Sequence, residues 1–62
     1  MRKELIKNFV EAYEKHFKNE NRNDATFENM QYAGWLLDKY DPEFTKNATY
    51  YKALYIKCKE VV

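Results

Sequence analysis

The sequence has very little of the residue types on which many structural and chemical sites depend. Its 62 residues include one cysteine, one histidine, one glycine and one proline. A single cysteine excludes a disulfide within the chain, and one cysteine with one histidine falls short of the four such ligands of a structural zinc site. One glycine excludes the glycine-rich loops that hold phosphate groups. We therefore predict that the protein binds no metal and no cofactor.

The sequence also lacks an excess of charge and any long apolar run. Eleven Lys and Arg stand against ten Asp and Glu, a formal net charge of +1. That balance removes the strong electrostatic argument for a nucleic-acid binder. Charged residues recur throughout, so we predict no signal peptide and no membrane span. A lone thiol, Cys58, is typical of a reduced compartment, and we predict a cytoplasmic protein.

Only Cys58 and His16 could serve as a nucleophile and its base. They lie in different predicted helices, each within or beside an apolar stripe, and a lone cysteine in such a stripe is usually a small core residue. Nucleophilic catalysis requires the base within hydrogen-bond reach of the nucleophile. We therefore predict no catalytic residues and a protein that is not an enzyme.

Aromatic side chains are the residues in excess. Phe, Trp and Tyr make up 18% of the chain, with six tyrosines. Two explanations are open. A chain of this size buries only about 60% of the surface that it exposes when unfolded, so large rings help to fill a small core. Tyr and Trp also gather at protein interfaces, because they combine apolar area with a polar group.

Hydrophobic periodicity predicts an all-α fold, with three helices in a single domain over residues 1–62. Apolar residues recur at helical spacing over roughly 2–18, 25–40 and 46–60, and nothing alternates as a strand does for more than a few residues. The pattern is typical of a small helical bundle.

Polar residues and the single proline mark the ends of the second helix. Asp24 or Thr26 is predicted to cap its start. Asp41 before Pro42 ends it, because the residue before proline avoids the helical region. The same pair, with Asp41 as cap, starts either a short helical turn at 42–46 or the first turn of the last helix.

The apolar stripes predict which side chains form the core. Gly34 lies in the inward arc of the second helix, where its lack of a side chain indicates close approach of a neighbouring helix. That arc comprises Phe27, Met30, Ala33, Gly34, Leu37 and Tyr40. The face of the last helix comprises Tyr51, Leu54, Tyr55, Cys58, Val61 and Val62. The residues predicted to be most buried are Phe9, Tyr13, Met30, Leu37, Leu54 and Cys58.

The second helix also carries large apolar groups outside its inward arc. Tyr32 and Trp35 fall nearly opposite that arc, and Leu36 lies on its border. Either the segment around Phe44 folds back to cover them, or they are exposed and contact another molecule. We predict the contact surface to consist of Glu28, Tyr32, Trp35, Leu36 and Lys39.

These observations predict a small non-enzymatic protein that acts by binding another protein or a second copy of itself. An adaptor, a regulator and an inhibitor of the kind encoded by phage or mobile elements all fit. The alternative is a helix-turn-helix-like nucleic-acid-binding protein whose last helix presents a basic side. The residues of that alternative are Lys46, Tyr50, Lys52, Lys57 and Lys59.

Overall fold

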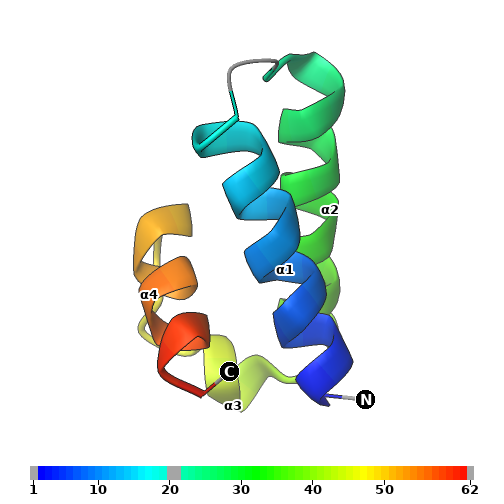
Figure 1. Cartoon of the computed structure of the whole chain (residues 1–62). Coiled ribbons are helices and arrows are strands. Elements are labelled where there is room, and N and C mark those ends of the chain that lie inside the picture. Colours follow the sequence, from blue (N-terminus) through cyan, green and yellow to red (C-terminus); the bar gives the residue numbers. More distant parts are fainter. Residues whose placement is uncertain (1, 20–21, 62) are drawn as a thin grey trace.

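A computed structural model describes residues 2–19 and 22–61, and every regular element in those ranges is a helix. The elements are α1 (Arg2–Phe17), α2 (Asp24–Tyr40), α3 (Pro42–Thr45) and α4 (Tyr51–Val61). Helices α1 and α2 lie side by side and antiparallel, and α4 packs against α1, with its first residue, Tyr51, reaching α2 (Figure 1). The short α3 links α2 to α4 at one end. The predicted all-α fold with three longer helices is confirmed.

Helix α1 follows the predicted stripe closely and ends one residue before the predicted boundary. Its apolar positions are three and four residues apart, so they fall on one face. That face supplies Ile6, Phe9, Val10 and Tyr13 to the core. The opposite face carries exposed lysines and acids, so α1 is half solvated and half buried.

Helix α2 is capped by Asn23, so the predicted cap at Asp24 or Thr26 is wrong. The Asn23 side-chain oxygen accepts from the Thr26 backbone N–H at 3.0 Å, and the Thr26 hydroxyl oxygen accepts from the Asn23 backbone N–H at 2.9 Å. This reciprocal pair is a capping box in which threonine takes the third helical position. His16 Nδ1 lies 2.9 Å from the same hydroxyl oxygen, which ties the end of α1 to the start of α2.

The short helical turn after Pro42 is present as α3, with Pro42 at its start. Asp41 occupies the position before it, but its side chain makes no capping hydrogen bond. Instead its carboxylate lies 2.6 Å from Arg2 Nε. The Arg2 guanidinium also lies 4.8 Å from the centroid of the Phe44 ring. Asp41 is therefore the N-cap residue of α3, as predicted, while its side chain ties the start of α1 to the end of α2.

Helix α4 begins at Tyr51, five residues later than the predicted start at residue 46. The reason lies at Asn47, whose φ of 75° is in the left-handed region that asparagine tolerates better than most residues. A hydrogen bond from Ala48 N to Thr45 O, 3.0 Å long, closes this turn. Val62, predicted to lie on the apolar face of α4, is outside the described residues.

The six residues predicted to be most buried all lie in the core. Phe9, Met30, Leu37 and Cys58 are completely buried, and Tyr13 and Leu54 nearly so. The list of core residues is completed by Ile6, Val10, Ala33 and Phe44.

The predicted close approach of a neighbouring helix at Gly34 is confirmed. A Cβ placed on Gly34 would lie 3.2 Å from Phe9 Cε1 and 3.7 Å from Tyr51 Cε1, so rings from α1 and α4 both meet α2 at this glycine. The two ends of the predicted inward arc differ from its middle. Phe27 and Tyr40 are exposed, because the neighbouring helices cover α2 most fully at its centre.

A polar cluster joins α4 to α1 beside the core. The Tyr55 hydroxyl donates to Glu14 Oε2 at 2.6 Å, and Lys18 Nζ donates to the same hydroxyl at 3.1 Å. The Tyr55 ring stacks on Tyr13 with centroids 4.0 Å apart. The hydrogen bond from Tyr55 lowers the pKa of the Glu14 carboxyl below its ordinary value, and Lys59 and Lys18 add to this effect.

Tyr55→Phe should destabilise the fold, because it removes one hydrogen bond to a carboxylate while keeping the ring stack. A carboxyl whose pKa is lowered by folding contributes stability above its unfolded pKa, and that contribution is lost as pH falls through the folded value. Urea titrations should therefore show a larger gap between wild type and Tyr55→Phe at pH 7 than below pH 4.5, the ordinary value. An equal gap at both pH values would contradict this assignment.

Candidate functional site

The outer face of α2 carries one stripe of large and charged side chains. Glu28, Tyr32, Trp35 and Lys39 follow one another at intervals of four, three and four residues. Such intervals keep side chains on one face of a helix, since about 3.6 residues make one turn. The stripe lies opposite the buried residues Met30, Ala33, Gly34 and Leu37. It therefore faces away from the core.

The two aromatic residues at the centre of this stripe are exposed and lie against each other. The side chains of Tyr32 and Trp35 are 61% and 53% exposed, and their rings stack with centroids 6.0 Å apart at 24°. Lys39 Nζ lies 5.0 Å from the Trp35 centroid and 5.4 Å from the Tyr40 centroid. The stripe is thus an ordered aromatic surface with a cation at one end.

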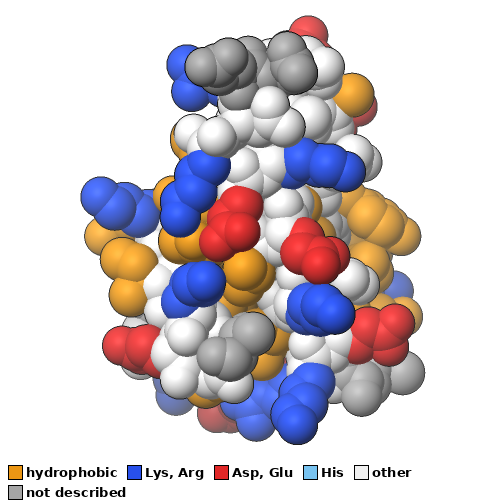
Figure 2. All heavy atoms as spheres, viewed as in Figure 1, with side chains coloured by type: hydrophobic (Ala, Val, Ile, Leu, Met, Phe, Trp, Pro, Cys, Tyr) orange, Lys and Arg blue, Asp and Glu red, His pale blue; other side chains and the backbone are white. Residues whose placement is uncertain are grey.

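The segment around Phe44 does not cover this surface, so that alternative is wrong. Phe44 is buried in the core and belongs to the side of the molecule where α3 meets α1 and α4. The Arg2 guanidinium and Lys57 Nζ lie 4.8 and 5.2 Å from its ring centroid. In the space-filling view, exposed hydrophobic side chains lie along the edge formed by α2, and others lie along the opposite edge, over α4 (Figure 2).

Leu36 connects the stripe to a groove between α1 and α2. The groove has a volume of about 640 Å³. Leu36 is half-buried at its wall, beside Tyr32. The groove therefore extends the apolar surface of α2 toward α1. Its other lining residues are Leu5, Asn8, Glu11, Ala12, Lys15, Asn29 and Ala33.

The structure therefore brings together all five residues of the predicted contact surface, and it adds Tyr40. The sequence pattern predicts Tyr40 within the inward arc, whereas its side chain is exposed beside Lys39. Its place at the last position of α2, directly before Asp41, is the signal that could have indicated exposure, because a helix end is less completely covered than its middle. We call Glu28, Tyr32, Trp35, Leu36, Lys39 and Tyr40 the α2 surface.

The residues of the nucleic-acid alternative are not gathered in the same way. Lys46 and Tyr50 precede α4, while Lys52 and Lys59 share one side of it. Lys57 is about 140° from Lys52 around the helix. Its Nζ donates a hydrogen bond to the Lys46 carbonyl oxygen at 3.4 Å. Lys59 Nζ lies 3.6 Å from Glu14 Oε2.

The two residues considered for nucleophilic chemistry, Cys58 on α4 and His16 on α1, each pack against other groups of the chain. Cys58 is completely buried, and burial raises the pKa of its thiol to about 11. A thiol that keeps its proton at neutral pH is a poor nucleophile. His16 lies beside the Thr26 hydroxyl and against the rings of Phe17 and Phe27. Within residues 2–19 and 22–61, no three His, Cys, Asp or Glu side chains are grouped as metal ligands.

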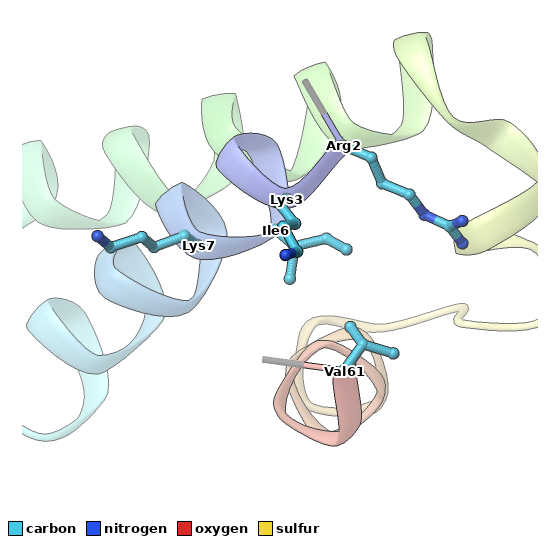
Figure 3. Close-up of a pocket in the computed structure, with 5 residues that line it drawn as sticks. All are labelled: Arg2, Lys3, Ile6, Lys7 and Val61. Atoms are coloured by element: carbon cyan, nitrogen blue, oxygen red, sulfur yellow. The ribbon is translucent and has the colours of Figure 1, made fainter.

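A second hollow, of about 530 Å³, lies between the first turns of α1 and the end of α4. Ile6 and Val61 face each other across it, while Arg2 and Lys7 extend away in opposite directions (Figure 3). Arg2 is already paired with Asp41. The hollow is an apolar gap with lysines at its rim rather than a set of polar groups converging on a ligand.

Comparison with known proteins found no matching family model, no similar curated protein and no similar solved structure. In the part of the chain that the structure describes, no helix has both the length and the apolar character needed to cross a membrane. The geometry of the side chains is therefore the basis for assigning a function.

Proposed function

We propose that this protein is a small non-enzymatic binding protein that acts through the α2 surface. One observation carries the proposal: Tyr32 and Trp35 are stacked and more than half exposed on the face of α2 opposite the core. A helix that served only to close the core would need one apolar stripe, and α2 has that stripe as well. The second stripe is explained by a partner.

The composition of the α2 surface supports protein binding. Trp and Tyr are among the residues that contribute most to interface affinity, particularly at the centre of a contact with charged groups at its rim. Here the two rings lie between Glu28 and Lys39, and Leu36 continues the apolar area into the groove. A cytoplasmic adaptor, regulator or phage-type inhibitor would use such a surface in the same manner.

Trp35→Ala should abolish association while leaving helix content and the melting temperature nearly unchanged. The reason is that an indole that is 53% exposed contributes little to folding, whereas truncation at the centre of an interface removes much of the binding energy. Affinity capture from lysate of the source cells, with wild type and the variant as baits, combined with light scattering, measures the association. Circular dichroism measures the fold.

Tyr50→Ala is the matched control, because Tyr50 is 64% exposed but lies outside the α2 surface. This variant should associate as wild type does. Trp35 is also the only tryptophan, so its emission reports directly on its surroundings. Solvent-exposed emission is expected for the isolated chain, with a blue shift on association. Association that is unchanged in Trp35→Ala would refute the proposed function.

Duplex DNA should bind weakly at physiological salt, with little of the steep salt dependence that accompanies the neutralisation of several phosphates. The expectation follows from the net charge of +1 and from the dispersed positions of Lys52, Lys57 and Lys59. Fluorescence anisotropy with labelled duplexes at several salt concentrations provides the measurement. Tight, salt-sensitive and sequence-selective binding would favour the nucleic-acid alternative instead.

A further inference from the structure

The stripe on α2 has an internal symmetry that the proposed function does not require. Glu28 and Lys39 are its two ends, and Tyr32 and Trp35 are its two central members. Both pairs have the same midpoint, between Ala33 and Gly34. At a rise of about 1.5 Å per residue, the charged ends lie roughly 16 Å apart along the axis, with the two rings placed symmetrically between them.

A stripe of this kind is complementary to itself when two copies meet in antiparallel orientation. In a two-fold symmetric contact, if one residue faces a second, the second also faces the first. With the symmetry axis at the common midpoint, Glu28 of each copy faces Lys39 of the other. Tyr32 of each copy then faces Trp35 of the other. The dimer thus contains two pairs of opposite charges and two pairs of aromatic rings.

The intervals of four, three and four residues fit the same arrangement. They are the spacing by which two helices pack side by side along a seam. A parallel arrangement would place Glu28 against Glu28 and Lys39 against Lys39, and like charges in contact are unfavourable. The charges of the stripe therefore select the antiparallel orientation.

From this geometry we infer that the partner of the α2 surface is a second copy of the chain, forming a symmetric dimer with the two α2 helices antiparallel. The inference rests on the proposed function, since it names the occupant of the same surface. Within the described residues, no ion pair uses Glu28 or Lys39, so both charges are available to the second copy. Lys39 needs only to move from the Trp35 ring toward the partner carboxylate.

Sedimentation equilibrium of the full chain, from micromolar to millimolar concentration, should give a mass approaching twice the 7.6 kDa of one chain. Glu28→Lys and Lys39→Glu should each weaken the dimer roughly tenfold, because each change replaces two attractive pairs per dimer by two repulsive ones. Combining both changes in one chain should restore most of the affinity. Glu43→Lys, the same change of charge at an exposed site on α3, should leave the dimer unaffected.

Disulfide trapping tests the orientation independently. When Glu28→Cys and Lys39→Cys chains are mixed under mild oxidation, the mixed disulfide between positions 28 and 39 should predominate over the like pairs. Native Cys58 is buried and does not compete. A predominance of like pairs, or failure of the double charge reversal to restore the dimer, would overturn the inference.

The failure of this inference is distinguishable from failure of the proposed function. A chain that stays monomeric at millimolar concentration, while wild type but not Trp35→Ala still captures another protein, would overturn the dimer and leave the binding function standing. A dimer that Trp35→Ala does not weaken would overturn the dimer inference. Capture of another protein that Trp35→Ala also leaves unchanged would overturn the proposed function as well.

Discussion

Phe9→Ala is expected to destabilise the fold by about 3–5 kcal/mol, the range for truncating a large buried aromatic side chain. Phe9 is completely buried where three helices meet: its ring lies against Gly34 of α2 and 6.5 Å, centroid to centroid, from Tyr51 of α4. A chain of this length has only roughly 3–9 kcal/mol of stability in total. The loss therefore amounts to between about a third and all of that stability, and the variant should unfold at a much lower urea concentration than wild type.

The measurement is the circular dichroism signal at 222 nm followed through a urea titration of wild type and variant. Phe9→Leu provides the matched control, because it keeps an apolar side chain at the position and should retain a cooperative transition with a smaller loss. The contact at Gly34 is close: a Cβ at that position would lie 3.2 Å from Phe9 Cε1, so the Phe9 ring packs directly against the backbone of α2. A loss of less than about 1 kcal/mol of stability in Phe9→Ala would show that Phe9 does not lie at the meeting point of the three helices.

Leu54→Ala is expected to cost roughly 2–5 kcal/mol, because Leu54 is 6% exposed and lies at the centre of the buried face of α4. Helix α4 has only eleven residues, too few to be stable in water without tertiary contacts. Loss of this side chain should therefore release α4 from α1. Urea titration should show a lower midpoint, and amide hydrogen exchange should be fastest within α4.

Ile56→Ala is the control on the same helix, since Ile56 is 50% exposed and is not among the residues of the predicted apolar face. It should change stability by less than about 1 kcal/mol. Leu54 and Ile56 are both aliphatic and lie two positions apart on one helix. Comparing the two alanine variants therefore separates the effect of burial from the effect of helix propensity. Equal losses in the two variants would mean that the wrong face of α4 has been assigned to the core.

The sequence by itself determined the helices and the centre of the core. Apolar side chains repeat at helical spacing over long stretches, and that repeat reflects the one face each helix must bury. The burial of Phe9, Leu37 and Cys58 follows from their central places in the stripes. The close approach at Gly34 was also predictable, because glycine destabilises the interior of a helix. Its presence there indicates that a neighbouring helix needs the space that a side chain would fill.

The sequence predicted the ends of the helices less well than their centres. Several neighbouring polar residues can each cap a helix, and they compete for that position. Asn23, Asp24 and Thr26 can all cap a helix, and only the folded backbone shows that Asn23 takes the position with Thr26 completing the box. Residues 46–50 have helix-compatible composition, but the left-handed conformation of Asn47 delays α4 to Tyr51. Such choices involve about 1 kcal/mol, which tertiary contacts readily override.

Only the tertiary structure decided the status of the α2 surface. The sequence placed Tyr32 and Trp35 away from the core of their own helix, but it left open whether Phe44 returns to cover them. The answer depends on where α3 packs, and that is decided by contacts distant in sequence, including the pairing of Arg2 with Asp41 and the stacking of Arg2 on Phe44. Because these contacts hold Phe44 in the core, Tyr32 and Trp35 stay exposed.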